Sequence, residues 1–72
     1  MDFDNIFKYH APTEEQKLRY ETLRYWAKEF AGAIVTNTPT SADQTAAIRK
    51  VREALMTANA AIALEGKSGL RL

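Results

Sequence analysis

The chain has 72 residues, which make at most one small domain, and a domain of this size usually needs stapling or oligomerisation to be stable. It contains no cysteine, so disulfides and thiolate metal sites are excluded. The net charge of +1 excludes binding to polyanions through bulk charge, and no apolar run approaches the roughly 20 residues of a membrane span.

The first segment, residues 1–7, has the pattern of a short amphipathic helix. Phe3, Ile6 and Phe7 recur at helical spacing, and two aspartates lie near the start, where they interact favourably with the helix dipole. A helix this short is not stable alone, so its aromatic side chains must dock on the rest of the protein. The segment lacks the apolar core of a signal peptide, and we therefore expect a soluble, cytosolic protein.

A connector, residues 8–12, follows with the sequence KYHAP. Pro12 disfavours a helical conformation at the residue before it, so the connector is expected to be extended. Tyr9 and His10 can stack on a flat ring. The alternative is a solvated linker whose tyrosine packs on the helices, and the connector taken alone favours that alternative.

Residues 13–36 are predicted to form the first long helix. Thr13 and Gln16 have the spacing of a capping box at its start. Leu18 and Tyr25 lie away from the apolar stripe, where only an oligomer would bury them. The stripe that we expect to face the core comprises Leu23, Trp26, Ala27, Phe30 and Ile34.

A second stripe on this helix combines cations with an aromatic side chain. Arg24 and Lys28 can meet phosphate groups, arginine as a planar fork and lysine as a point charge. The alternative is a solvated face on which Glu21 and Glu29 form ordinary ion pairs. The stripe comprises Lys17, Tyr20, Arg24 and Lys28. Between the stripes, Gly32 predicts a kink or a close helix crossing.

Residues 41–65 are predicted to form the second helix, followed by a frayed tail over 66–72. Pro39 ends the first helix, and Ser41 with Gln44 has the spacing of a second capping box. Because the loop is short, the second helix should fold back antiparallel on the first. Gly66 is a natural C-terminal stop.

The second helix has an apolar arc that is wider than one partner helix usually covers. Its seam comprises Ile48, Val51, Leu55, Ala58 and Ile62. Beside the seam runs an alanine flank of Ala47, Ala54 and Ala61. We expect the seam to pack within the chain and the flank to meet a second chain. Asn59 lies near the seam, where it can control helix register or donate to a ligand, and register control is the favoured interpretation.

The residues offer little for catalysis. His10 has no acidic pair at ligand spacing, so no metal site is expected. No nucleophile context and no glycine-rich phosphate loop is recognisable. We therefore expect a binding protein without cofactor or enzymatic activity. A small DNA-binding regulator and a purely structural hairpin remain alternatives, although the helices offer only a thin surface for reading a duplex.

Several segments, in order and spacing, resemble the phage anti-CBASS cyclic-nucleotide sponges, which share a helical-hairpin domain with the anti-Thoeris sponges. The resemblance spans about Phe7 to Ala63. The segments are Phe7-Lys8-Tyr9-His10-Ala11-Pro12, Arg19-Tyr20 with Leu23-Arg24, Thr38-Pro39 with Ser41 and Gln44, Arg52-Glu53-Ala54 with Met56, and Ala58-Asn59-Ala60-Ala61-Ile62-Ala63.

This resemblance implies an all-α homohexamer in the cytoplasm of an infected bacterial host. It implies sequestration, without cleavage, of the cyclic oligonucleotides that activate CBASS effectors. Cyclic dinucleotides lie between protomers in this family, some members also hold cyclic trinucleotides, and the anti-Thoeris relatives capture signals of the cyclic ADP-ribose type.

The resemblance also implies which residues bind the ligand. The family's aromatic in the connector corresponds to Tyr9, and its cation on the first long helix to Arg24 or Lys28. The ligand-binding set expected for this chain is Tyr9, His10, Pro12, Arg24 and Lys28. The chain departs from the family at Thr57, where many relatives have a tryptophan, and carries its own at Trp26. The packing between protomers is therefore expected to differ.

Overall fold

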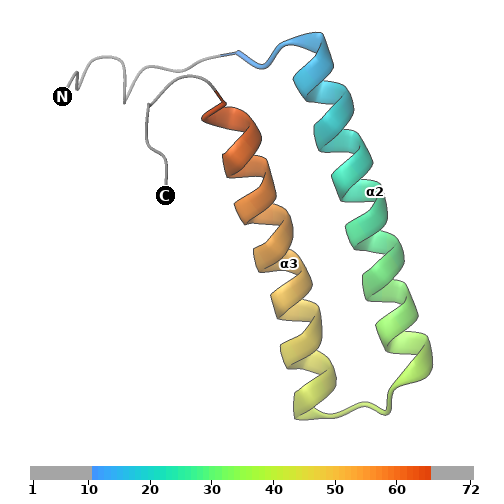
Figure 1. Cartoon of the computed structure of the whole chain (residues 1–72). Helices are drawn as coiled ribbons and strands as arrows, with labels where there is room; N and C mark the ends of the chain where they lie inside the picture. Colours follow the sequence, from blue (N-terminus) through green and yellow to red (C-terminus); the bar gives the residue numbers. More distant parts are fainter. Residues whose placement is uncertain (1–10, 66–72) are drawn as a thin grey trace, which may run out of the picture.

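The computed structural model describes residues 11–65, which form two long helices, α2 (Glu14–Asn37) and α3 (Ala42–Ala63). The helices run antiparallel and side by side, joined by a short loop (Figure 1). The described part contains no strand, so the prediction of an all-α helical hairpin is confirmed. The helix expected over 1–7 and the tail expected over 66–72 lie outside the described residues.

Helix α2 begins at a complete capping box, as the spacing of Thr13 and Gln16 predicted. The Gln16 backbone N–H donates to Thr13 Oγ1 at 3.1 Å, and the Thr13 N–H donates to Gln16 Oε1 at 3.0 Å. Two N–H groups that the helix itself cannot satisfy are thereby paired. Glu14 and Glu15 in the first turn also complement the helix dipole.

The loop between the helices corrects one detail of the prediction. Ser41 caps α3, because its Oγ accepts from the Gln44 backbone N–H at 3.1 Å. The Gln44 side chain, however, does not return to Ser41. Its Nε2 donates instead to the carbonyl oxygen and to Oγ1 of Thr38, each at 3.2 Å. The second box is therefore replaced by a bridge across the loop to the C-cap of α2.

Helix α3 ends earlier than the predicted residue 65. Its last helical residue is Ala63, and Leu64 is the C-cap, whose N–H donates to the Ala60 carbonyl oxygen at 3.0 Å. The Glu65 N–H then donates to the Ile62 carbonyl oxygen at 3.1 Å, which closes a turn. The expected stop at Gly66 lies outside the described residues.

The hairpin by itself has almost no core. Among residues 11–65 only Ile62 and Gln16 are buried, each at 8% exposure. Trp26 and Phe30, which we predicted to be core residues, are 63% and 60% exposed. That prediction is wrong for the single chain because one partner helix cannot cover the whole width of the stripe. The half-buried apolar residues between the helices are Leu23, Ala27, Ile34, Ile48, Val51, Leu55 and Ala58.

Three other positions show how much of the surface is left uncovered. Leu18 and Tyr25 are exposed, as predicted for a single hairpin. Gly32 lies inside an uninterrupted α2, and a Cβ added there would meet nothing within 4 Å. The close crossing that Gly32 predicted is therefore not made within residues 11–65.

Candidate functional site

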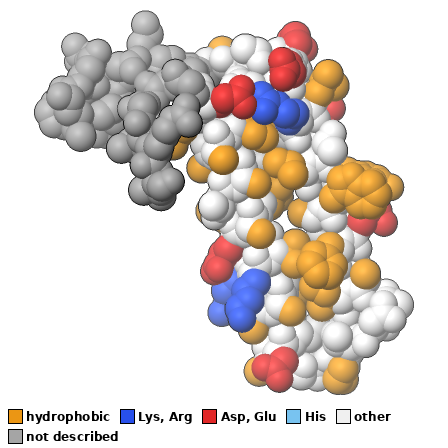
Figure 2. All heavy atoms as spheres, viewed as in Figure 1, with side chains coloured by type: hydrophobic (Ala, Val, Ile, Leu, Met, Phe, Trp, Pro, Cys, Tyr) orange, Lys and Arg blue, Asp and Glu red, His pale blue; other side chains and the backbone are white. Residues whose placement is uncertain are grey.

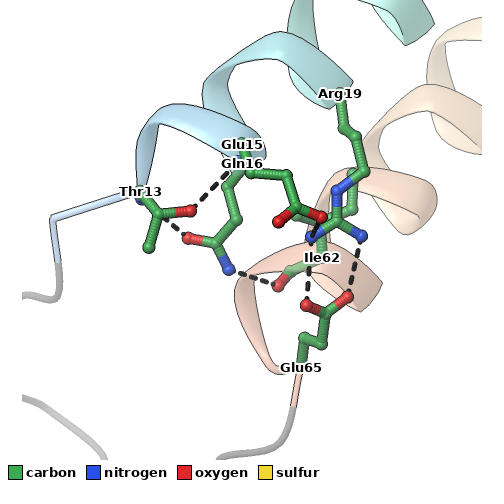
Figure 3. A network of polar contacts seen from close by, with 6 residues as sticks. All are labelled: Thr13, Glu15, Gln16, Arg19, Ile62 and Glu65. Carbon is green, nitrogen blue, oxygen red and sulfur yellow. Dashed lines mark hydrogen bonds and ion pairs between the residues drawn. The ribbon is translucent and has the colours of Figure 1, made fainter.

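The open end of the hairpin, where the connector enters, is held by polar contacts (Figure 3). The Gln16 side chain reaches across from α2, and its Nε2 donates to the Ile62 carbonyl oxygen at 3.1 Å in a buried hydrogen bond. The last carbonyl groups of a helix lack partners within the helix. Gln16 thus supplies a partner near the end of α3 while its Oε1 completes the capping box of α2.

An ion pair lies beside this contact. Arg19 Nη1 and Nη2 donate to the two carboxylate oxygens of Glu65 at 2.8 and 3.0 Å, a bidentate geometry. Arg19 also lies 3.8 Å from a carboxylate oxygen of Glu15. The hydrogen bonds from Arg19, and then its charge, hold the pKa of Glu65 below its ordinary value. We name Gln16, Arg19, Ile62 and Glu65 together the polar clasp.

The polar clasp places the start of α2, and therefore the end of the connector, against the end of α3. Within the connector the structure describes Ala11, which is exposed, and Pro12, which is half-buried. Tyr9 and His10 lie outside the described residues. Of the predicted ligand-binding residues, Pro12 thus directly precedes Thr13, which is hydrogen-bonded to Gln16 of the clasp.

The basic stripe is only partly neutralised. Lys17 pairs with Glu14 at 3.2 Å. Arg24 and Lys28 are exposed, and neither forms an ion pair within residues 11–65. The ion pairs expected from Glu21 and Glu29 are not formed there, whereas the exposure of Arg24 and Lys28 agrees with the alternative of a solvated face. Two cations remain available on one face of α2, with the half-buried Tyr20 beside them.

The opposite side of the hairpin carries an apolar groove of about 540 Å³ between the helices. Figure 2 shows hydrophobic side chains gathered along the line where the two helices meet. At about 100° per residue, Arg24 and Trp26 lie about 160° apart around α2, so the basic stripe and the groove face different directions. The groove is lined by Leu23, Trp26, Ala27, Phe30, Ile34, Ala47, Lys50, Val51, Ala54, Leu55 and Ala58.

Two side-chain atoms, one of them in the polar clasp, have unused hydrogen-bonding capacity within residues 11–65. The Oδ1 atom of Asn59 and the Nε atom of Arg19 are inaccessible to solvent and have no hydrogen-bond partner within the described part of the chain. Asn59 is half-buried on α3. A buried amide oxygen without a donor is uncommon in folded proteins. Whether Asn59 controls helix register therefore stays a prediction.

The polar clasp was not predicted from the sequence, although the sequence contains a signal for it. Gln16 and Ile62 are each 23 residues from Pro39, so a symmetric antiparallel hairpin brings them to the same level. Capping boxes accept either glutamate or glutamine. Glutamine at position 16 is therefore a sign that a second, donating contact is made there.

The described residues contain no helix that is long and apolar enough to cross a membrane. They also contain no group of three or more histidine, cysteine, aspartate or glutamate side chains that could hold a metal ion. His10 lies outside that part of the chain.

Comparison with protein families matches residues 2–63 to the model described as Acb2/Tad1, hairpin domain. No curated protein and no solved structure matches the chain. The match covers both helices, their loop and the connector, which include the segments that carry the resemblance. The chain therefore belongs to the Acb2/Tad1 hairpin-domain family of sponges for cyclic nucleotide signals.

Proposed function

We propose that this protein sequesters cyclic oligonucleotide second messengers of bacterial antiviral immunity and does not cleave them. The observation that carries this proposal is the family match over residues 2–63. Capture lowers the free concentration of the messenger, so the CBASS effector that needs it stays inactive. Such a mechanism requires tight binding and slow release rather than turnover.

The ligand chemistry fits the predicted site residues. A cyclic dinucleotide presents two base faces and two phosphates. Tyr9 and His10 in the connector supply rings for stacking, and Pro12 adds apolar surface. Arg24 and Lys28 supply positive charge that no acidic side chain in residues 11–65 neutralises. We therefore assign the base contacts to the connector and the phosphate contacts to the basic stripe.

A single hairpin is too small to enclose such a ligand. Only two of the described residues are buried, and the 540 Å³ groove leaves Trp26 and Phe30 largely exposed. Exposed apolar surface of this kind marks a contact with another molecule. We propose that copies of this chain cover it in a homohexamer, so that ligand pockets form between protomers. A pocket between subunits can bury more of the ligand than two helices can.

The second candidate ligand is a signal of the cyclic ADP-ribose type. The matched family description names both branches of the family, so it does not choose between them. Such a signal also combines a base face with phosphates, and the same residues can bind it. Cyclic trinucleotides, held in a separate class of site, are the third possibility to be measured.

The decisive experiment is a thermal-shift panel with separate ligands. It contains cyclic di-AMP, cyclic di-GMP, cyclic GMP–AMP, a cyclic trinucleotide, cyclic ADP-ribose isomers and a short DNA duplex. A ligand that binds the native state stabilises it by mass action and so raises Tm. At a ligand concentration of 100 times Kd, the free energy of unfolding rises by about 2.7 kcal/mol. We expect a cyclic dinucleotide to raise Tm and the duplex to leave it unchanged.

Two further measurements complete this test. The protein–ligand complex is denatured and the released ligand is analysed by mass spectrometry, with recovery of unmodified ligand expected. Cleaved product would identify a hydrolase instead of a sponge. Native mass spectrometry counts the chains in the assembly, for which we expect six. A Tm that responds only to the duplex would favour the DNA-binding alternative.

A further inference from the structure

The Gln16 side chain joins two parts of the protein that are far apart in sequence. Its Oε1 accepts from the Thr13 N–H at 3.0 Å, and its Nε2 donates to the Ile62 carbonyl oxygen at 3.1 Å. Gln16 is one of the two buried residues in the described part of the chain, so water competes little for either bond. One amide thus holds the start of α2 to the end of α3 (Figure 3).

The capping role alone does not explain a glutamine at this position. A glutamate would accept from the Thr13 N–H equally well, and capping boxes use both residue types. Of these two side chains, only glutamine offers a donor to the Ile62 carbonyl oxygen, which also accepts from the Glu65 N–H. A carboxylate would instead place an oxygen against that carbonyl, in a site too buried for water to relieve the repulsion.

Gln44 provides the comparison within the same chain. Its backbone N–H also donates to the residue that caps its helix, Ser41. Its Nε2, however, contacts only Thr38, in the neighbouring loop and in exposed surroundings. The two glutamines thus share a helix position but lie at opposite ends of the hairpin, and only Gln16 lies near the connector.

The residue held by Gln16 is the one at which the connector ends. Thr13 follows Pro12 directly, and the proline ring restricts the backbone to a narrow range of φ. The Thr13 N–H is held by the Gln16 side chain, which in turn is held by the Ile62 carbonyl oxygen, so these contacts set the direction of the chain between Pro12 and Thr13. We propose that Gln16 is a positioning residue, which fixes Pro12 at the end of the connector and so sets the affinity for a cyclic dinucleotide. This inference rests on the proposed function.

The test compares Gln16→Glu with Gln44→Glu as the matched control. Kd is measured by calorimetry for cyclic di-AMP, cyclic di-GMP and cyclic GMP–AMP, with helix content and assembly mass measured on the same samples. At about pH 8 we expect Gln16→Glu to raise Kd about tenfold, which is the scale of one lost buried hydrogen bond. Gln44→Glu should leave Kd unchanged, and both variants should retain their helices.

A change of pH supplies the readout that separates positioning from general stability. Burial raises the pKa of a carboxyl group, so the substituted side chain can be protonated near pH 5. Once protonated, it can donate to the Ile62 carbonyl oxygen while its other oxygen accepts from Thr13. The ratio of the Kd of Gln16→Glu to the wild-type Kd should then fall toward one, with wild type measured at each pH as the reference.

Three results would overturn this assignment. They are an unchanged Kd in Gln16→Glu, a Kd ratio that is the same at both pH values, and a loss of affinity that accompanies a loss of helix content. A wild-type protein that binds none of the three dinucleotides would instead refute the proposed capture of dinucleotides, and the role of Gln16 with it. The two failures are therefore distinguishable.

Discussion

At the scale of single residues, the cations that we assign to the ligand form no ion pair with the described part of the hairpin. Lys17 and Arg19 are engaged in ion pairs, whereas Arg24 and Lys28 have no such partner in the described part of α2 and α3. Both are exposed, so neither contributes to the small core. Cations that form no ion pair within residues 11–65 are available to an anionic ligand.

We expect Tyr9→Ala to weaken ligand binding without dissociating the oligomer. Stacking of an aromatic side chain on a base contributes about 1–3 kcal/mol, which corresponds to about five- to 150-fold in Kd. Calorimetry measures Kd, and native mass spectrometry measures the oligomer. Tyr9→Phe keeps the ring and should bind nearly as well as wild type. Dissociation of the Tyr9→Ala assembly would show that the tyrosine belongs to the packed interior.

At the scale of helices, the sequence predicts most of what the structure contains. Capping residues and apolar periodicity located both helices, because these signals depend on neighbours within one turn. The sequence did not reveal the contacts from Gln16 to Ile62 and from Arg19 to Glu65, since these depend on which levels of α2 and α3 meet. It also assigned Trp26 and Phe30 to the core, because periodicity shows which face is apolar but not what covers it.

The ion pair of Arg19 with Glu65 predicts how the stability of the folded hairpin depends on pH. The pKa of Glu65 is lower in the folded protein, mainly because Arg19 donates hydrogen bonds to the carboxylate. The stabilisation is thus present above the pKa of glutamate in the unfolded chain and is lost as the pH falls through the lower, folded pKa. We expect Glu65→Gln to lower Tm at neutral pH.

The comparison with wild type across pH tests this prediction. Thermal unfolding followed by circular dichroism should give Tm curves for wild type and Glu65→Gln that converge in the acid range, below the ordinary glutamate pKa of 4.5. Glu53→Gln is the control, because Glu53 is exposed on α3 and forms no ion pair in residues 11–65. A constant Tm difference between wild type and Glu65→Gln at every pH would show that the charge of Glu65 is not responsible.

At the scale of the whole molecule, the two sides of the hairpin differ in polarity and therefore in how favourably they contact water. The groove side is apolar and leaves Trp26 and Phe30 in contact with water, which is unfavourable for a separate chain. The side with Arg24 and Lys28 is charged and stable in water. These differences favour an assembly in which groove surfaces are covered by other protomers while the cations stay accessible to a ligand.

This arrangement predicts that Ala54→Arg disrupts the assembly and Ala60→Arg does not. Both alanines are exposed on α3 of the single hairpin, but only Ala54 lines the groove. A long charged side chain there would prevent another backbone from approaching and would bury a charge without a partner. Trp26, the only tryptophan in the chain, lines the same groove and reports the result through its fluorescence. Its emission should be that of a buried indole in wild type and in Ala60→Arg, and should shift to longer wavelength in Ala54→Arg as the assembly mass falls. An indole that is exposed in the wild-type assembly would show that the groove is not where the protomers meet.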